Sequence, residues 1–367
     1  MFDLKKLNSK ILKLLGCYII FFLILHFLDN RVNVYPSTVY FITYENGFVS
    51  RGLIGTVLRF FITDAHIKIF SKIICCTMLT LYIIYIFNSI IKVLKKSKND
   101  NFVFCLLFCF CSSFLLVYSK WEYYMTLDIF WLFISIFIFL CFNNLKKWKI
   151  PIIFLLSITG IFIHQGFLFT MCPIICILFL DNKKYKTFFI YGISMICIFL
   201  FCQFGGNVDA ETVFNSAIFH ASVADVELFP EAVEKMQKMI YLEYKYNVWD
   251  HFSLIGNEYP FYIKTAIIYI VTNLINLFFL FKLLNKIKFN MNKKLYIAIL
   301  IISQIPLLVL TIDLDRWTVL MILNLYMFLL YKARKGEINE NLQFSKKYIP
   351  LFFINLLMVI FSQYLVL

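Results

Sequence analysis

The chain has 367 residues, of which 62% are hydrophobic, and its mean hydropathy is +0.82. A soluble domain carries only about 45–50% apolar residues, so this composition excludes an ordinary soluble fold and predicts an all-α, polytopic membrane protein. The net charge of +14 fits that class without a nucleic-acid partner, because basic residues of membrane proteins gather in cytoplasmic loops.

Apolar runs along the chain predict about eleven transmembrane helices, judged against the ~20 residues that a bilayer requires. They cover residues 11–28, 67–91, 102–118, 128–143, 150–163, 167–180, 187–204, 262–284, 293–311, 317–331 and 348–365. Within the first of these, the apolar run Leu14 to Leu28 follows four lysines and no small-residue cleavage site comes after it, so it is expected to be an uncleaved membrane helix. The whole chain, 1–367, is then a single integral membrane domain.

The fifth and sixth predicted helices are short, and His164, Gln165 and Gly166 separate them. Lysines at both ends of this stretch favour a hairpin, because a single span would place basic residues on both sides of the membrane. One long span is the alternative, and it would reverse the orientation of every later helix.

The distribution of charge supports this topology. With a cytoplasmic N-terminus, the cytoplasmic segments hold 24 of the 35 basic residues and only five of the 21 acidic residues. Two outer segments are long. Residues 29–66 are expected to form a re-entrant or interfacial segment. Residues 205–261 are expected to form a large outer loop, with an amphipathic helix that begins near Phe229.

Acidic, basic and histidine side chains cluster at the predicted outer boundary of the membrane, where charged groups are costly unless they are paired or hydrated. Asp29 follows the first helix. In the segment TYENGFVSRGLIG, Glu45 and Arg51 lie among three glycines, which would let the backbone approach closely at membrane depth. The alternative is an interfacial helix in which Glu45 and Arg51 simply face water.

Two further outer turns carry candidate residues. Glu122 and Asp128 belong to SKWEYYMTLD, where a functional site and a solvated turn with helix caps are both open. His164 lies at the tip of the predicted hairpin and could shuttle a proton near neutral pH. A hydrogen-bonded histidine that only stabilises the turn is the alternative.

The stretch TIDLDRW combines Asp313, Asp315, Arg316 and Trp317 between two predicted helices. The guanidinium fork of an arginine suits phosphate, and a nearby carboxylate can pair with it or take a proton from a hydroxyl. An Asp–Arg pair that only ties two helix ends is the alternative. We expect this stretch to face the first outer segment.

Motifs of serine hydrolases, zinc proteases, P-loop enzymes and dinucleotide-binding enzymes are absent from the sequence. The outer arginines and carboxylates suit glycosyl transfer from a polyprenyl-linked sugar. The candidates for receiving the acceptor's proton are Glu45, His164, Asp313 and Asp315. The candidates for binding the substrate are Arg51, Arg316, Trp317, Glu122, Asp128 and Asp29.

The chain resembles the Wzy-type polymerases of O-antigen and capsule in its number of spans, its length and its long outer loops with arginines and acids. It also resembles the wider GT-C lipid-sugar transferases, which place acidic residues in the first outer loop, as Asp29 and Glu45 are placed. The resemblance implies polymerisation of undecaprenyl-diphosphate-linked repeat units at the periplasmic face of a bacterial inner membrane, without a cofactor or metal.

The resemblance also implies the partners: a lipid-linked glycan, membrane lipid and a chain-length regulator protein, with no nucleic acid. One alternative is a GT-C-type enzyme that transfers a single sugar from a polyprenyl phosphate. Another is a flippase or transporter of lipid-linked sugars, which would be expected to carry charges near the membrane centre and symmetry between its halves.

Overall fold

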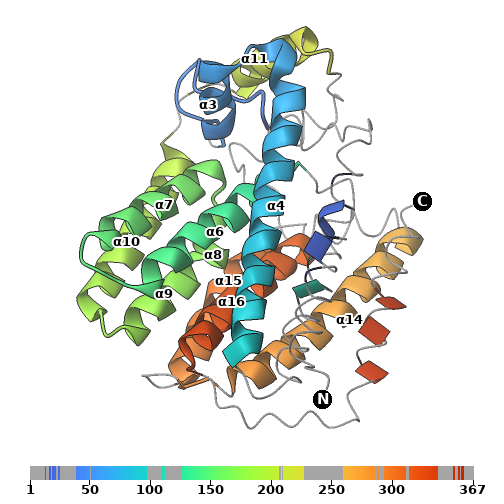
Figure 1. The fold of residues 1–367 in the computed structure, drawn as a ribbon. Helices are drawn as coiled ribbons and strands as arrows, with labels where there is room; N and C mark the ends of the chain where they lie inside the picture. Colours follow the sequence, from blue (N-terminus) through green and yellow to red (C-terminus); the bar gives the residue numbers. More distant parts are fainter. Residues whose placement is uncertain are drawn as a thin grey trace. The chain divides into compact units, whose positions relative to one another are not determined.

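A computed structural model gives the fold of the chain (Figure 1). It describes residues 39–49, 51–96, 125–205, 210–226, 259–285, 293–310 and 314–337, with isolated positions in 13–24, 110–114, 208, 287–288 and 350–358. The numbered elements in these ranges are all helices, which confirms the predicted all-α class.

The helix bounds are α3 Leu53–Phe61, α4 Asp64–Lys96, α6 Asp128–Asn143, α7 Lys149–Ile163, α8 Phe167–Thr170, α9 Cys172–Asp181, α10 Tyr185–Phe204, α11 Ala210–Val223, α14 Tyr259–Leu284, α15 Lys293–Leu310 and α16 Leu314–Lys335. Most of them coincide with predicted apolar segments. Helix α11 was not predicted. The amphipathic helix expected near Phe229 lies outside the described residues, as do most positions of the segments 11–28, 102–118 and 348–365.

The chain forms two compact units. One contains Ile24–Thr80 and Trp121–Asn247, and therefore α3, the first half of α4 and α6 to α11. The other contains Met1–Leu23, Leu81–Lys120 and Val248–Leu367, and therefore the second half of α4 and α14 to α16.

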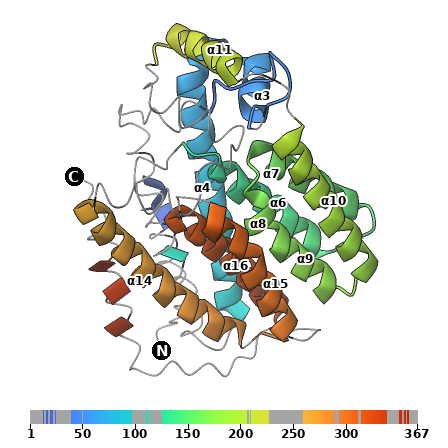
Figure 2. The same ribbon diagram turned by 180° about the vertical axis from the view of Figure 1, so that it is seen from behind.

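In the first unit, helices α6 to α10 lie side by side (Figure 2). Helix α7 ends at Ile163, because the next residue, His164, has an extended backbone with φ −164° and ψ 127°. The chain then folds back so that the ring of Phe167 packs directly against Gly160. The carbonyl of Gly160 also accepts a 3.0 Å hydrogen bond from Trp131 Nε1. The segment 150–180 is therefore interrupted at His164, as predicted, and is not one continuous helix.

Two buried tyrosines of this unit donate hydrogen bonds that join its segments, as buried hydroxyl groups in native proteins generally do. Tyr191 Oη donates to Ser157 Oγ at 2.8 Å and so ties α10 to α7. Tyr40 Oη donates to the carbonyl oxygen of Met125 at 2.8 Å. This second bond fixes the segment before α3 against the start of the α6 region.

In the other unit, α14 packs against α16. The buried Asn276 of α14 accepts a 2.8 Å hydrogen bond from Asn355 Nδ2. Helix α16 ends just before Gly336, whose positive φ of 75° suits the left-handed residue that commonly terminates a helix. Near this end, Arg334 Nη1 donates to the hydroxyl of Tyr85 at 3.1 Å.

Two described helices are long and apolar enough to cross a membrane: Asp64–Lys95 within α4, and Tyr185–Phe204, which is α10. Length and composition alone are weak evidence of a membrane protein, since core helices of soluble proteins can pass the same test. The predicted count of eleven spans therefore stays a prediction.

Candidate functional site

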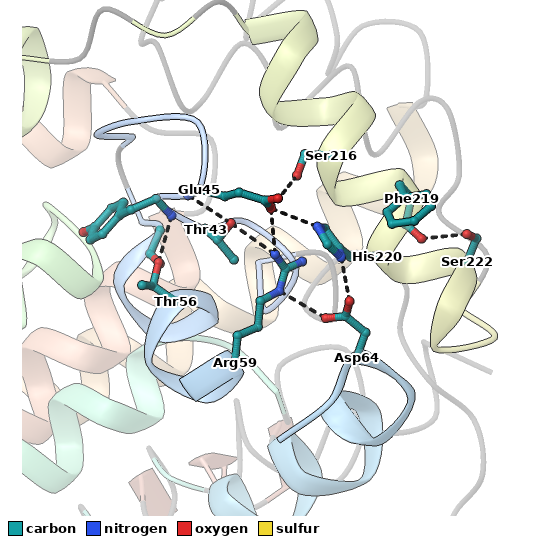
Figure 3. Close-up of polar contacts among 11 residues, drawn as sticks. Thr43, Glu45, Thr56, Arg59, Asp64, Ser216, Phe219, His220 and Ser222 are labelled. Atoms are coloured by element: carbon teal, nitrogen blue, oxygen red, sulfur yellow. Dashed lines mark hydrogen bonds and ion pairs between the residues drawn. The ribbon is translucent and has the colours of Figure 1, made fainter. Parts of the chain in front are cut away.

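Four charged or titratable side chains converge in the first unit, one from the loop before α3 and one each from α3, α4 and α11 (Figure 3). At their centre, Glu45 Oε2 accepts hydrogen bonds from Arg59 Nη1 at 3.1 Å and Ser216 Oγ at 3.3 Å. The same oxygen lies 3.0 Å from His220 Nε2. The first outer segment predicted from the sequence is thereby joined to the second.

Asp64 adds a second carboxylate to this group of side chains. Asp64, in the first turn of α4, places Oδ1 3.1 Å from Arg59 Nε and Oδ2 2.6 Å from His220 Nδ1. Each ring nitrogen of His220 thus faces a carboxylate oxygen. The ring can donate to both carboxylates only when it carries two protons. We call Glu45, Arg59, Asp64 and His220 the outer cluster.

The local chain geometry positions Glu45 over α3. Thr56 Oγ1 accepts a 2.8 Å hydrogen bond from the backbone N–H of Tyr44 and donates one of 2.7 Å to the carbonyl of Gly52. A single threonine therefore fastens the segment before α3 to the first turn of the helix. Glu45 follows Tyr44, so its carboxylate is carried to the side of α3 that presents Arg59.

The three glycines of this stretch permit close approaches, as predicted. A Cβ on Gly55 would lie 2.1 Å from the carbonyl oxygen of Ile42, which belongs to the backbone. A Cβ on Gly52 would lie 2.7 Å from the ring of Tyr44. Gly47 has φ 117°, a conformation that side-chain-bearing residues rarely adopt.

The electrostatics of the outer cluster keep Glu45 ionised. The hydrogen bond from His220 is the largest influence on the pKa of Glu45 and lowers it, partial burial acts in the opposite direction, and the charges of His220 and Arg59 lower it further. The Glu45 side chain is 55% exposed, so its carboxylate is available to a ligand.

Arg59 is held more deeply, with 18% of its side chain exposed. No hydrogen-bond acceptor for its buried Nη2 atom is present in the part of the chain that the structure describes. A buried donor without an acceptor costs about 1–3 kcal/mol.

The predicted residue Arg51 lies in the turn before α3 with φ 66°. This left-handed conformation costs a residue with a side chain roughly 1–2 kcal/mol. Strained residues of this kind cluster at functional sites. The observation adds support to Arg51 as a candidate, beside Glu45, which the structure places in the outer cluster.

Asp128 and His164 are both buried, at 1% and 7% exposure. Asp128 begins α6, where a carboxylate interacts favourably with the helix dipole. His164 Nδ1 accepts a 3.2 Å hydrogen bond from the backbone N–H of Gly166, and its ring meets Trp131 edge to face. Both residues therefore lie inside the helix bundle, and their predicted roles in a site stay predictions.

Most of the remaining predicted site residues have side chains outside the part of the chain that the structure describes. Asp29, Glu122 and Asp313 lie outside the described residues, and Asp315 and Arg316 are described only as backbone in the first turn of α16. Trp317 is buried. The stretch 313–317 belongs to the other unit, so its predicted meeting with the first outer segment stays a prediction.

Sequence reasoning missed Arg59, Asp64, His220 and Ser216 as site residues. One signal for Arg59 was present, since it is the only charged residue in the nine-residue helix LIGTVLRFF. The residues around His220 in the sequence gave no indication that it belongs to a site. Only the prediction that both long segments lie on one face of the membrane could have suggested that their polar residues meet.

Comparisons with protein-family models, with curated proteins and with solved structures found no match for this chain. The likeness to Wzy-type polymerases therefore rests on the pattern of its sequence.

Proposed function

We propose that the chain is a multi-span membrane protein, with about eleven spans and the outer cluster on the outer face of a bacterial cytoplasmic membrane. The surface of α10 supports membrane placement, because only 22% of the most hydrophobic 18-residue stretch of this helix is buried inside the protein. A core helix of a soluble protein is mostly buried. The exposed large apolar residues of α10 are Tyr185, Phe189, Ile190, Ile193, Ile196, Leu200, Phe201 and Phe204.

The reaction that we propose is glycosyl transfer between polyprenyl-diphosphate-linked saccharides. The bond between the sugar C1 and the phosphate oxygen of the donor breaks, and a bond forms between C1 and an acceptor hydroxyl oxygen. The hydroxyl proton passes to a base on the protein. The lipid diphosphate leaves with the electron pair of the broken bond, so no redox step is needed.

The observation that carries this proposal is the outer cluster itself, because it combines a half-exposed carboxylate with an arginine and an imidazole. The Glu45 side chain is 55% exposed, so its carboxylate would be within reach of the acceptor hydroxyl and would receive the proton. His220 would stabilise the Glu45 carboxylate, and Asp64 would hold the imidazole in place from the other ring nitrogen.

Arginines would bind the diphosphate. Arg59 has a buried Nη2 group for which the described residues provide no acceptor, and guanidinium groups bind phosphate oxygens well. Arg59 is already paired with two carboxylates, so it cannot neutralise a diphosphate alone. Arg51, in the adjoining turn, would supply further positive charge, and Arg316 stays a candidate from the sequence.

Single-sugar transfer of the GT-C type is the second candidate. It is favoured by one observation, which is that both carboxylates of the outer cluster, Glu45 and Asp64, come from the predicted first outer segment. The GT-C enzymes resembled by this chain place acidic residues in that loop. In both cases the sugar C1 is transferred to an acceptor hydroxyl, but the leaving group is a lipid phosphate in single-sugar transfer and a lipid diphosphate in polymerisation.

Deletion of the gene in the source cells tests the class of function. Polymerisation predicts loss of the long-chain glycan ladder, with lipid-linked single repeat units accumulating at the outer face of the membrane. A flippase would instead leave these units at the inner face, where an added membrane-impermeant glycosidase cannot reach them. Unchanged glycans in the deletion strain contradict both glycan functions.

A further inference from the structure

Helix α3 both buries and exposes apolar residues. The residues that it buries against the protein are Ile54, Gly55 and Leu58. Three other apolar residues of this helix are exposed: Phe60 at 80%, Phe61 at 82%, and Val57. A helix whose outer face meets water carries polar residues there, whereas a helix that is apolar all round is surrounded by protein or lipid.

The single charge of α3 does not make its outer face polar. Arg59 directs its guanidinium to Glu45 and Asp64 in the outer cluster, at 3.1 Å from each, and only 18% of its side chain is exposed. The two neighbouring phenylalanines are therefore presented without a charged residue of α3 beside them.

The exposed surface of α10 continues towards α3. Phe48, in the loop before α3, packs on Phe201 of α10 with 4.9 Å between ring centroids, and on Phe162 of α7 with 5.8 Å. Phe201 is itself exposed, as is Phe204 at the end of α10. The aromatic rings thus connect the surface proposed to contact lipid with the segment that leads into α3.

The other candidate span begins directly after α3. Only two residues separate Phe61 from Asp64, the first residue of α4, so the end of α3 must lie close to the start of that helix. The first turns of α4 also expose apolar side chains. They are Ile69, Phe70 and Ile73.

We propose that α3 docks into the bilayer interface, with Val57, Phe60 and Phe61 inserted between the lipid headgroups and the upper acyl chains. Interfacial helices bury their apolar face in that boundary region. The inference rests on the membrane placement proposed above and does not depend on glycosyl transfer. It would hold the outer cluster at the membrane surface, where the diphosphate of a polyprenyl lipid also lies.

Fluorescence of the full chain in phospholipid vesicles tests this docking. Three variants each add one tryptophan: Phe61→Trp in α3, Ile193→Trp on the exposed face of α10, and Glu211→Trp on the exposed first turn of α11. The signal is the difference from the parent protein, which has five tryptophans. The quenchers are acyl chains brominated near the headgroup, acyl chains brominated near the chain end, and acrylamide in the water.

Docking predicts loss of the Phe61→Trp emission with lipid brominated near the headgroup and little loss with acrylamide. Quenching of this tryptophan by acrylamide alone, or by no reagent, contradicts docking, because α3 then faces water or protein. Ile193→Trp should be quenched by chain-end bromine. If it is quenched by no brominated lipid, the membrane placement itself is wrong. If the Phe61→Trp variant does not fold, the quenching of Phe60→Trp is measured in its place, with the same expected results.

Discussion

The Nε2 atom of His220 lies 3.0 Å from Oε2 of Glu45, although the two residues are 175 positions apart in the chain. Its other ring nitrogen lies 2.6 Å from Asp64 Oδ2. One imidazole therefore joins α11 to two acids that flank α3. In the proposed topology, these contacts link the two long outer segments of the protein.

Asp64 and His220 should stabilise the fold together. Both side chains are less than one-fifth exposed, so a double-mutant cycle of Asp64→Asn and His220→Gln should give a coupling of about 1–2 kcal/mol. The measurement is thermal unfolding in detergent, with Glu211→Gln as a control in an exposed acid of α11. Strictly additive effects of the two substitutions would show that the contact contributes nothing.

The contribution of Glu45 should depend on pH. Its folded-state pKa is lowered, chiefly by the hydrogen bond from His220, so the ionised carboxylate favours the folded state at pH values above the ordinary glutamate range. This contribution should persist at neutral pH and disappear as the pH falls through the lowered pKa. The difference in melting temperature between parent and Glu45→Gln, measured against pH, checks it. A difference that grows on acidification contradicts the direction of the pKa shift.

Substitutions of Arg51 should affect stability through its backbone conformation and function through its guanidinium group. Because its φ is 66°, Arg51→Gly should be more stable than Arg51→Ala by about 1 kcal/mol, since both variants lack the side chain and only alanine retains the backbone strain. Both substitutions remove the guanidinium, so both should shorten the glycan ladder. The assays are thermal unfolding and glycan gels of complemented deletion cells. A full ladder with either variant would remove Arg51 from the proposed site.

Gly55 should tolerate no side chain. In Gly55→Ala, the new Cβ would meet the backbone oxygen of Ile42 at 2.1 Å, so we expect destabilisation of about 1–3 kcal/mol from overpacking. Gly192→Ala in α10 is the matched control, since its added Cβ would meet no described heavy atom within 4 Å apart from the neighbouring residues and backbone of its own helix. Equal melting temperatures for the two variants would contradict the close approach at Gly55.

The helices were largely predictable from the sequence, because long apolar runs bounded by lysines mark their own limits. The segment 128–143 coincides with α6, and the interruption at His164 follows from its polar neighbours. Helix α11 was not predictable in this way. Its residues have ordinary polarity, and its folding depends on contacts with distant parts of the chain.

The site was predicted only in part. Glu45 and the glycines around it attracted attention because acids and glycines are unusual beside apolar spans. The partners of Glu45 gave little sign of their role, since Arg59 lies in an apolar helix and Asp64 resembles an ordinary helix-starting acid. Which polar residues meet across 150 or more positions depends on tertiary packing, as the 156-residue separation of Asp64 and His220 illustrates.

The most direct test of the proposed site is the glycan ladder made by deletion cells that express Glu45→Gln, compared with cells that express Glu211→Gln at equal membrane levels. Both substitutions replace an exposed acid on the first unit by its uncharged isostere. Loss of a general base predicts at least about a 100-fold fall in polymerised glycan for Glu45→Gln and a parental ladder for Glu211→Gln. A parental ladder with Glu45→Gln would contradict the assignment of the outer cluster as the site of glycosyl transfer.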